Sequence, residues 1–471
     1  MRVVLDIETD SLTPKLIHCI VCKDIDTGEV YSWVQKECYT QFPSFAKRPK
    51  LIIAHNGIDF DLPVLSNLLG VQFDPGRVVD TLVLSRLLNF KFEGGHSLEN
   101  WGKRLGFPKH AQPDFSVYSP QMLEYCIQDV QLNHKVYEIL SKGISPKNQE
   151  AVDLEHQIAW VCREMQDNGF GFNKDEADAL YVEINKRVEE IDQGLQEAFP
   201  PKIKEVPLKT KIRREIIPFN PSSPKQIVER LEGFWSPKER TEVGQAKICE
   251  ANLATLSDEA PEAAKSLVER LLLAGRLRAL KQWMDAYNEQ TKRIHGRTNS
   301  IGTWTHRASH NSPNTGNIAT KKSIKYKGKE LANLASSLGE RLRGLWQAAP
   351  GKLLVGTDAD QIQLRIFADY IDDAVFTNAL VNGDKKLGTD LHSLHAKLLE
   401  VEARDDSKTW IYAYFLGCGD EKSGFILGGR DRKFGRQKKL EFQERYPGLA
   451  KLRKERIPQD AKRGYAEEPS K

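Results

Sequence analysis

The first residues of the chain alternate between apolar and polar positions, which predicts a β-strand. The segment R-V-V-L-D-I-E-T-D begins at Arg2. Side chains two residues apart on a strand point to the same face, so Asp6 and Glu8 share one face while their apolar neighbours occupy the other. The pattern predicts a strand that presents two carboxylates together.

A second apolar run, residues 51–54, predicts another strand and leads into H-N-G-I-D-F-D, which places Asp61 in a turn beyond the strand end. A helix is predicted to begin after Ser119, because serine is a good N-cap and the proline that follows it fits a first helical turn. On that helix Tyr125 and Asp129 are four residues apart and therefore lie on one face.

The pattern from about residue 150 to residue 290 is helical, with long amphipathic runs at 154–167 and 263–288. Between them, the basic and proline-containing segment 200–214 predicts a loop. Such a loop is either a solubilising linker or a segment that binds the backbone of duplex DNA. The sequence leaves both interpretations open.

Another helix is predicted from Arg404 to Leu416, R-D-D-S-K-T-W-I-Y-A-Y-F-L. Arg404, Lys408 and Tyr412 fall on successive turns of one face. Two cations one turn apart repel each other, whereas a bound polyanion would use both, the Arg as a planar fork and the Lys as a mobile charge. Tyr412 would then present its ring to a sugar or base. A solvated basic face is the alternative.

Composition bounds the class of protein. The 471 residues include 69 Lys+Arg and 65 Asp+Glu, for a formal net charge of +4, and 40% are hydrophobic. This length allows about two to four domains of ordinary globular composition. Lys and Arg gather toward the C-terminus, as is typical of nucleic-acid-binding surfaces. With no signal peptide and no run of about eighteen apolar residues, we expect a cytoplasmic protein without membrane contact.

The cysteines indicate reduced thiols. There are seven, an odd number scattered along the chain, which is typical of an intracellular protein. Cys19 and Cys22 form a C-x2-C, but no second pair stands at zinc-site spacing. The pair therefore predicts an apolar strand with two buried thiols.

Four of the carboxylates have the composition of a site for two metal ions: Asp6, Glu8, Asp61 and Asp129. Brought together, they would repel one another unless hard cations neutralised them. Oxygen-only ligands suit Mg²⁺ or Mn²⁺, and two such ions about 4 Å apart support hydrolysis of a phosphodiester. Tyr125 would hold or orient the attacking water.

In residue types and order, residues 1–145 resemble the proofreading 3′–5′ exonuclease of the DEDD type, tyrosine subclass. The resemblance includes D-T-L at Asp80 and H-S-L-E-N-W-G at His96, which we interpret as framework. It implies an RNase H-like domain, a mixed sheet flanked by helices, that acts on 3′ ends of single-stranded DNA. The implied metal ligands are Asp6, Glu8, Asp61 and Asp129.

The rest of the chain resembles family A DNA polymerases of the short-tailed phage branch. F-N-P-S-S-P at 219–224 is similar to their thumb. G-T-W-T-H-R-A-S-H-N-S-P-N at 302–314 is similar to an element on the template-primer side, which implies DNA-binding roles for Arg307 and Asn314. His306 replaces the glycine that is usual in this element.

Residues Lys352 to Asp358 predict an apolar strand that ends on a carboxylate, and with A-D-Q-I-Q-L-R they resemble the family's motif A. The resemblance implies that Asp358 is a catalytic metal ligand, with two Mg²⁺ or Mn²⁺ ions in the complete site. Gln363 stands where a glutamate usually closes the space for a ribose 2′-OH. Leu416 stands where the family has a second Tyr. The implied dNTP-binding residues are Gln363, His392, Arg404, Lys408 and Tyr412.

The resemblance implies an α/β and mainly helical multidomain fold, an exonuclease domain followed by parts of a right-hand polymerase. The sequence contains no His-Asp-Glu turn of the kind that supplies the second palm carboxylate. We therefore expect polymerisation to need a second polypeptide that completes the palm. The implied domains are exonuclease 1–145, thumb 150–300, first part of the palm 301–375, fingers 376–455 and a divergent tail 456–471.

Two functions remain open. The first is a replicative, viral DNA polymerase with proofreading, in the host cytoplasm, whose partners are DNA primer-template, single-stranded 3′ ends and dNTPs. The second is a stand-alone 3′–5′ DNA exonuclease whose polymerase part only binds DNA. A third possibility, a catalytically silent nucleic-acid-binding remnant, is disfavoured by the intact set of exonuclease residues.

Overall fold

The computed structural model describes residues 1–463 except for 208–211, 238–239, 242, 254, 320–324, 327–328 and 331–333. The chain divides into two compact units, Met1–Leu354 and Val355–Lys471. Each unit has hydrophobic clusters of its own. The predicted tail lies outside the described residues from position 464 onward.

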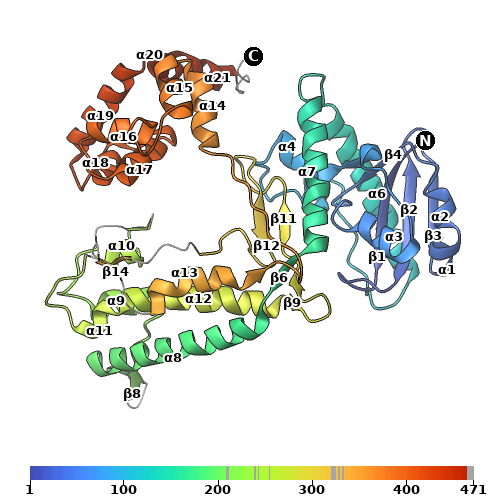
Figure 1. Cartoon of the computed structure of the whole chain (residues 1–471). Coiled ribbons are helices and arrows are strands. Elements are labelled where there is room, and N and C mark those ends of the chain that lie inside the picture. The colour runs from blue at the N-terminus through green and yellow to red at the C-terminus, as the bar shows by residue number, and fades with distance from the viewer. Residues whose placement is uncertain are drawn as a thin grey trace. The chain divides into compact units, whose positions relative to one another are not determined.

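A five-stranded mixed sheet, in the order β3-β2-β1-β4-β5, lies at the beginning of the first unit (Figure 1). Its central strand β1 (Arg2–Thr9) is antiparallel to β2 (Ile17–Asp24) and parallel to β4 (Leu51–Ala54). The two strands predicted for this region are confirmed, and so is the burial of Cys19 and Cys22 on a strand. The remaining strands are β3 (Val30–Val34) and β5 (Val78–Asp80).

Helices cover both faces of this sheet (Figure 1). On one face Val4 shares a buried cluster with Cys126 of α6 (Pro120–Ser141). On the other face Leu5 shares a cluster with Leu62 of α3 (Asp61–Leu69). The alternation seen in the sequence thus separates two cores, and the face of Val4 is also the face of Asp6. The other helical segments here are α1 (Lys36–Thr40), α2 (Phe42–Phe45), η1 (Pro75–Arg77), α4 (Thr81–Leu88), α5 (Leu98–Arg104) and α7 (Gln149–Asn168).

The start of α6 confirms the predicted cap. The backbone N–H of Met122 donates to Ser119 Oγ at 3.2 Å, and Pro120 occupies the first turn. An N-cap serine satisfies one of the amide donors that a helix leaves unpaired at its start. Because this cap fixes where α6 begins, it also fixes which residues of the helix face the sheet.

The middle of the first unit is built on two long helices, α8 (Lys174–Ala198) and α12 (Leu267–Asp285), which lie side by side (Figure 1). Arg187 pairs with Glu269 at 3.0 Å, and Arg270 pairs with Asp192. The helical arm is therefore confirmed. Smaller elements around it are β6 (Phe170–Phe172), α9 (Pro224–Arg230), α10 (Glu250–Leu253), α11 (Glu262–Lys265), β9 (Tyr287–Asn288), β10 (Arg293–Ile294), β11 (Arg297–Asn299), β12 (Ser309–Asn311), β13 (Lys325–Tyr326), β14 (Lys329–Glu330), α13 (Leu334–Gly344) and β15 (Trp346–Gln347).

The basic segment 200–214 is not the loop that the sequence predicted. β7 (Lys202–Pro207) and β8 (Ile212–Ile217) form an antiparallel ribbon. Apolar and charged residues alternate at its start, and each strand satisfies the backbone N–H and C=O groups of the other. Residues 208–211 lie outside the described residues.

The second unit is helical in its described part. Its core includes Trp410 of α17 (Arg404–Phe415), Phe442 and Tyr446, all fully buried. The indole N–H of Trp410 donates to Ser423 Oγ at 2.7 Å. The helix predicted from Arg404 is confirmed. The other helical segments are α14 (Ile362–Ile371), α15 (Ala374–Val381), α16 (Leu391–Leu398), α18 (Asp420–Ile426), α19 (Arg432–Arg445), α20 (Pro447–Lys451), η2 (Leu452–Arg456) and α21 (Ile457–Arg463).

The strand predicted from Lys352 to Asp358 is wrong. These residues form no strand, and the side chains of Leu353 and Val355 are 89% and 88% exposed. A strand is stable only when its backbone groups pair with a neighbouring strand, and no described strand pairs with this segment. Apolar sequence alone therefore gave the wrong local structure.

Among the described helices, none combines the length and the apolar character needed to cross a bilayer.

Candidate functional site

β1 and α6 bring together the acidic residues expected near the N-terminus. Asp6, Glu8 and Cys126 place their possible ligand atoms within 4.8 Å of one another. The Cys126 thiol donates to Asp6 Oδ2 at 3.4 Å. Glu8 is only 9% exposed, so the pair of carboxylates predicted on one strand face lies inside the fold.

Asp61 joins this group from α3. Its Oδ1 accepts a hydrogen bond from the backbone N–H of Ile7 at 3.2 Å, which holds the side chain against the middle of the Asp6–Glu8 pair. The sequence placed Asp61 in a turn, but it is the first residue of α3. A carboxylate in the first turn of a helix is favoured by the positive end of the helix dipole.

Asp129 completes the set from α6, one turn after Tyr125. It is 4% exposed, and among the described residues its Oδ1 has no hydrogen-bond partner. Its other oxygen pairs with the ammonium of Lys109, which also lies 4.6 Å from the centre of the Tyr125 ring. One oxygen thus remains available inside a buried acidic site.

Burial and mutual repulsion determine the protonation of the four carboxylates. Burial, then Asp61, Glu8 and Asp129, raise the pKa of Asp6 well above its usual range. Burial and Asp129 raise the pKa of Glu8 to about 8, and burial raises the pKa of Asp61 to about 7. These are the shifts expected of acidic groups that share a poorly solvated site.

The donor set fits divalent metal ions. The four buried carboxylates supply oxygen atoms, the ligands that Mg²⁺ and Mn²⁺ prefer. The unpartnered oxygen of Asp129 is one such donor. Bound cations would remove the repulsion that raises the pKa values of Asp6 and Glu8. We therefore assign Asp6, Glu8, Asp61 and Asp129 as the residues that would hold the ions.

The sequence did not point to Lys109. Although burial disfavours its charge, Asp129 and Tyr125 raise the pKa of Lys109 above its usual value. It lies in the segment between α5 and α6, and no local motif marks it. Cys126 was noticed only as a thiol. It stands three residues before Asp129 on α6, and this spacing on one helix face was an available sign that Cys126 lies close to the site.

Two residues that were interpreted as framework have that role. Asp80 accepts hydrogen bonds from the backbone N–H groups of Asn56 at 2.9 Å, Ile58 at 3.1 Å and Leu82 at 2.9 Å. His96 bonds to Ser85 Oγ at 2.7 Å and to the Phe90 carbonyl at 3.0 Å. Asp80 is the last residue of β5 and the N-cap of α4.

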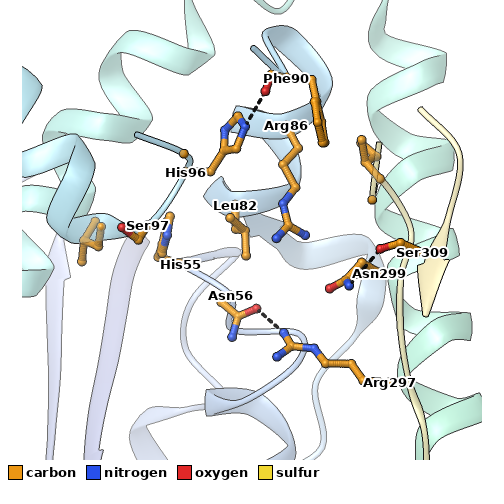
Figure 2. Close-up of a pocket in the computed structure, with 14 residues that line it drawn as sticks. His55, Asn56, Leu82, Arg86, Phe90, His96, Ser97, Arg297, Asn299 and Ser309 are labelled. Carbon is orange, nitrogen blue, oxygen red and sulfur yellow. Dashed lines mark hydrogen bonds between the residues drawn. The ribbon is translucent and has the colours of Figure 1, made fainter. Parts of the chain in front are cut away.

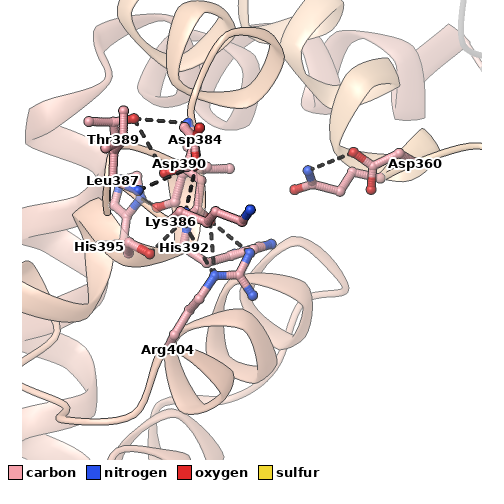
Figure 3. Close-up of polar contacts among 12 residues, drawn as sticks. Asp360, Asp384, Lys386, Leu387, Thr389, Asp390, His392, His395 and Arg404 are labelled. Carbon is pink, nitrogen blue, oxygen red and sulfur yellow. Dashed lines mark hydrogen bonds and ion pairs between the residues drawn. The ribbon is translucent and has the colours of Figure 1, made fainter.

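The second unit holds a smaller polar cluster around Asp390 (Figure 3). Arg404 pairs with Asp390 at 2.7 Å, with a second hydrogen bond of 3.1 Å from its Nε. Against the effect of burial, Arg404 and Ser393 lower the pKa of Asp390 to about 2. The guanidinium predicted to bind a triphosphate is thus held by a carboxylate of the same unit.

His392 lies beside this ion pair. It is 1% exposed, and neither ring nitrogen has a hydrogen-bond partner among the described residues. Burial, followed by the nearby charge of Arg404, lowers the pKa of His392 to about 4. Its ring lies 6.2 Å from that of Tyr412, and Lys408 of the same helix is exposed. The structure therefore groups His392, Arg404, Lys408 and Tyr412.

The predicted motif A residues do not join that group through any described hydrogen bond or ion pair. Asp358 is exposed in the segment before α14, and Gln363 is half-buried in the first turn of α14. Burial, and then the charge of Asp360, raise the pKa of Tyr412. Asp360, which the sequence did not single out, is thus a carboxylate that acts on α17 in addition to Asp390.

The predicted DNA-binding residues Arg307 and Asn314 lie in the first unit. Arg307 is exposed between β11 and β12, and its N–H donates to Thr303 Oγ1 at 3.1 Å. Asn314 Oδ1 accepts from the N–H of Gly316 at 3.0 Å. His306 has a left-handed φ of 57°. Glycine adopts that conformation without strain, which explains its use at the corresponding position of the family.

The sequence model of DNA polymerase family A matches residues 190–470, more than half of the chain. The DNA-directed DNA polymerase of Enterobacteria phage T3 is 28% identical over 96% of this chain and 80% of its own length. That of Escherichia phage T7 is 27% identical over the same shares.

A solved structure shows the same fold. The POL domain of Pol1 from M. smegmatis, in complex with DNA primer-template and dNTP, superposes with a TM-score of 0.73 at 16% identity. The match covers 99% of this chain and 76% of that chain. The predicted α/β and mainly helical multidomain fold is confirmed. Fold and family model agree, and the chain belongs to DNA polymerase family A.

Proposed function

We propose that this family A DNA polymerase also carries a 3′–5′ exonuclease that proofreads during viral DNA replication. The observation that supports the exonuclease is the buried set of Asp6, Glu8, Asp61 and Asp129 beside Tyr125. Structural carboxylates are seldom buried together without cations. The substrates would be 3′ ends of single-stranded DNA.

Each residue of this site has a role that follows from its position. The four carboxylates would hold two Mg²⁺ or Mn²⁺ ions, which when bound supply an activated water and charge stabilisation at the phosphate. Tyr125, only 5% exposed, would orient the attacking water. Lys109, above the Tyr125 ring, would supply positive charge beside the anionic strand.

The decisive experiment removes the two carboxylates of β1. Asp6→Ala with Glu8→Ala should abolish Mg²⁺-dependent removal of 3′ nucleotides from single-stranded DNA, because both carboxylates lie among the metal ligands. Degradation of an end-labelled oligonucleotide, with and without EDTA, measures this. The matched control is Glu150→Ala with Asp153→Ala, two exposed acidic residues on α7. Full activity in the double variant would refute the assignment.

For the polymerase part, we propose that Arg404, Lys408, Tyr412, His392 and Gln363 bind dNTP, that Arg307 and Asn314 contact primer-template, and that Asp358 is a metal ligand. The domain boundaries given above belong to the same proposal. We also propose that a segment with a His-Asp-Glu turn, which residues 1–471 do not contain, completes the palm. The exposure of residues 352–358 favours the alternative for this chain alone, a 3′–5′ exonuclease with a DNA-binding polymerase part.

A further inference from the structure

A cavity of about 530 Å³ lies in the first unit, and none of the four carboxylates of the acidic site lines it (Figure 2). Its walls come from α4, from the loop after β4, from the segment before α5 and from the β11–β12 ribbon. None of its described lining residues is Asp or Glu, whereas two are arginines, Arg86 and Arg297. The lining therefore carries net positive charge.

Arg86 is the most informative residue of this cavity. Its side chain points from α4 into the hollow (Figure 2). Burial, and then the like charge of Arg297, lower its pKa. Asp80 and Asp59 attract it and act in the opposite direction on its pKa, but no hydrogen bond or ion pair joins its guanidinium to a described residue. A half-buried guanidinium whose donors have no acceptor is costly, and a bound anion would supply one.

Arg297 is held differently. Its guanidinium donates to Asn56 Oδ1 at 3.1 Å and pairs with Asp59, while its Nε has no partner among the described residues. These contacts fix the direction of the Arg297 side chain along the cavity floor (Figure 2). A fixed guanidinium beside an unpaired one suits a group with several acceptor oxygens.

The remaining lining suits a nucleotide better than a bare anion. Asn299 and Ser309, joined by a hydrogen bond of 3.3 Å, offer neutral polar groups at one edge. Leu82 and Phe90 offer apolar surface at another. An aromatic ring next to a cationic groove is a common platform for a base.

One loop contributes both to the cavity and to the acidic site. Asn56, which lines the cavity, begins the loop that ends at Asp61. Asp80 fixes that loop through its hydrogen bonds to the N–H groups of Asn56 and Ile58. The loop therefore links a lining residue of the cavity to a carboxylate of the acidic site.

We propose that this cavity binds one phosphate-bearing nucleotide unit, with Arg86 and Arg297 on the phosphate and Phe90 against the base. The unit belongs either to a single-stranded segment of DNA or to a free nucleoside monophosphate, since both present the same group. Binding here requires no cleavage, so it does not depend on the exonuclease activity proposed above.

The test measures binding of fluorescent oligo(dT) and, separately, of deoxyadenosine 5′-monophosphate to the full chain in EDTA, where cleavage is absent. Arg86→Gln should weaken binding about ten- to a hundredfold, since it removes a charge-assisted contact with phosphate. For the oligonucleotide, the slope of log affinity against log salt should fall by about 0.7. Arg77→Gln, an exposed arginine of the same sheet region, is the matched control.

Asn299→Asp provides a second variant, because it keeps the shape of the lining and adds a negative charge. Thermal melting of every variant verifies the fold. Loss of oligo(dT) binding alone in both variants supports a single-stranded segment as the occupant, whereas parallel loss of monophosphate binding supports a free nucleotide. Unchanged binding of both probes in folded Arg86→Gln and Asn299→Asp proteins would overturn the proposal.

Discussion

Lys109 and Arg404 are cations that pair with a carboxylate inside a candidate site. Lys109 contacts Asp129, and Arg404 contacts Asp390. Each pair keeps a buried charge compensated, because an isolated one would be strongly disfavoured. Each cation is therefore already paired before substrate arrives. An incoming phosphate must compete with a carboxylate for it.

Histidines of the second unit couple its stability to pH. His395 is fully buried, and its Nε2 lies 2.6 Å from the Tyr446 hydroxyl. Burial lowers the pKa of His395 to about 4, and that of His392 also to about 4. Since an unfolded histidine has a pKa of about 6.5, the unfolded state binds more protons between these values. Stability is therefore full above about pH 6.5 and falls as the pH drops toward 4.

His395→Gln tests this coupling. The variant should lose part of the pH dependence of stability, because it lacks one of the imidazole groups that stay neutral in the folded state. For each buried histidine the wild type should lose about 1–2 kcal/mol between pH 7 and pH 5. Hydrogen exchange of α16 and α17, corrected for the intrinsic rate, measures the change. His110→Gln, at an exposed position of the first unit, should leave the pH dependence of stability intact. Equal slopes of stability against pH for the wild type and both variants would contradict the explanation.

At the scale of elements, patterns between neighbours in the sequence predicted β1 and the start of α6. Contacts between segments that are far apart in the sequence were not predicted. The alternation in β1 and the cap at Ser119 depend on neighbours in sequence, and both are present. The contact between Lys109 and Asp129 depends on how a loop folds back onto α6, which no spacing encodes. The predicted strand at Lys352 to Asp358 failed because pairing partners, not apolar residues, make a strand.

The cationic face of α17 is the element whose predicted role is tested most directly. Lys408 is exposed on it, next to half-buried Arg404 and Tyr412. Lys408→Gln should weaken dNTP binding about tenfold or more, since a charged hydrogen bond to phosphate is lost. Equilibrium binding of a fluorescent dNTP analogue gives the measurement. Lys422→Gln, exposed on α18, is the control, and equal affinities of the two variants would show that this face is only solvated.

At the scale of the molecule, the two compact units separate the two proposed chemistries. The acidic site and the cavity lined by Arg86 belong to Met1–Leu354, whereas the polar cluster around Asp390 belongs to Val355–Lys471. Membership of the polymerase family covers residues in both units. Activities that depend on one unit are thus open to separate measurement in the full chain.

Primer extension is the test at this scale. We expect this chain alone to bind primer-template and dNTP but to extend a primer poorly, since one carboxylate motif cannot hold both ions of a two-metal site. Extension of a labelled primer, with Asp6→Ala and Glu8→Ala present to prevent degradation, gives the answer. Addition of a polypeptide that carries a His-Asp-Glu turn should restore synthesis. Robust extension without it would show that Asp358 finds its partner carboxylate elsewhere.

The structural role of Asp80 affects how substitutions of acidic residues in this protein are interpreted. It is 2% exposed, and it ties the loop that leads to Asp61 by two backbone amides, while its own N–H donates to His156 Nε2 at 2.9 Å. Replacing Asp80 would displace that loop without removing any of the four proposed metal ligands. A mutational scan scored only by lost turnover would then count Asp80 together with the four proposed ligands, and a melting curve beside each assay would separate the two roles.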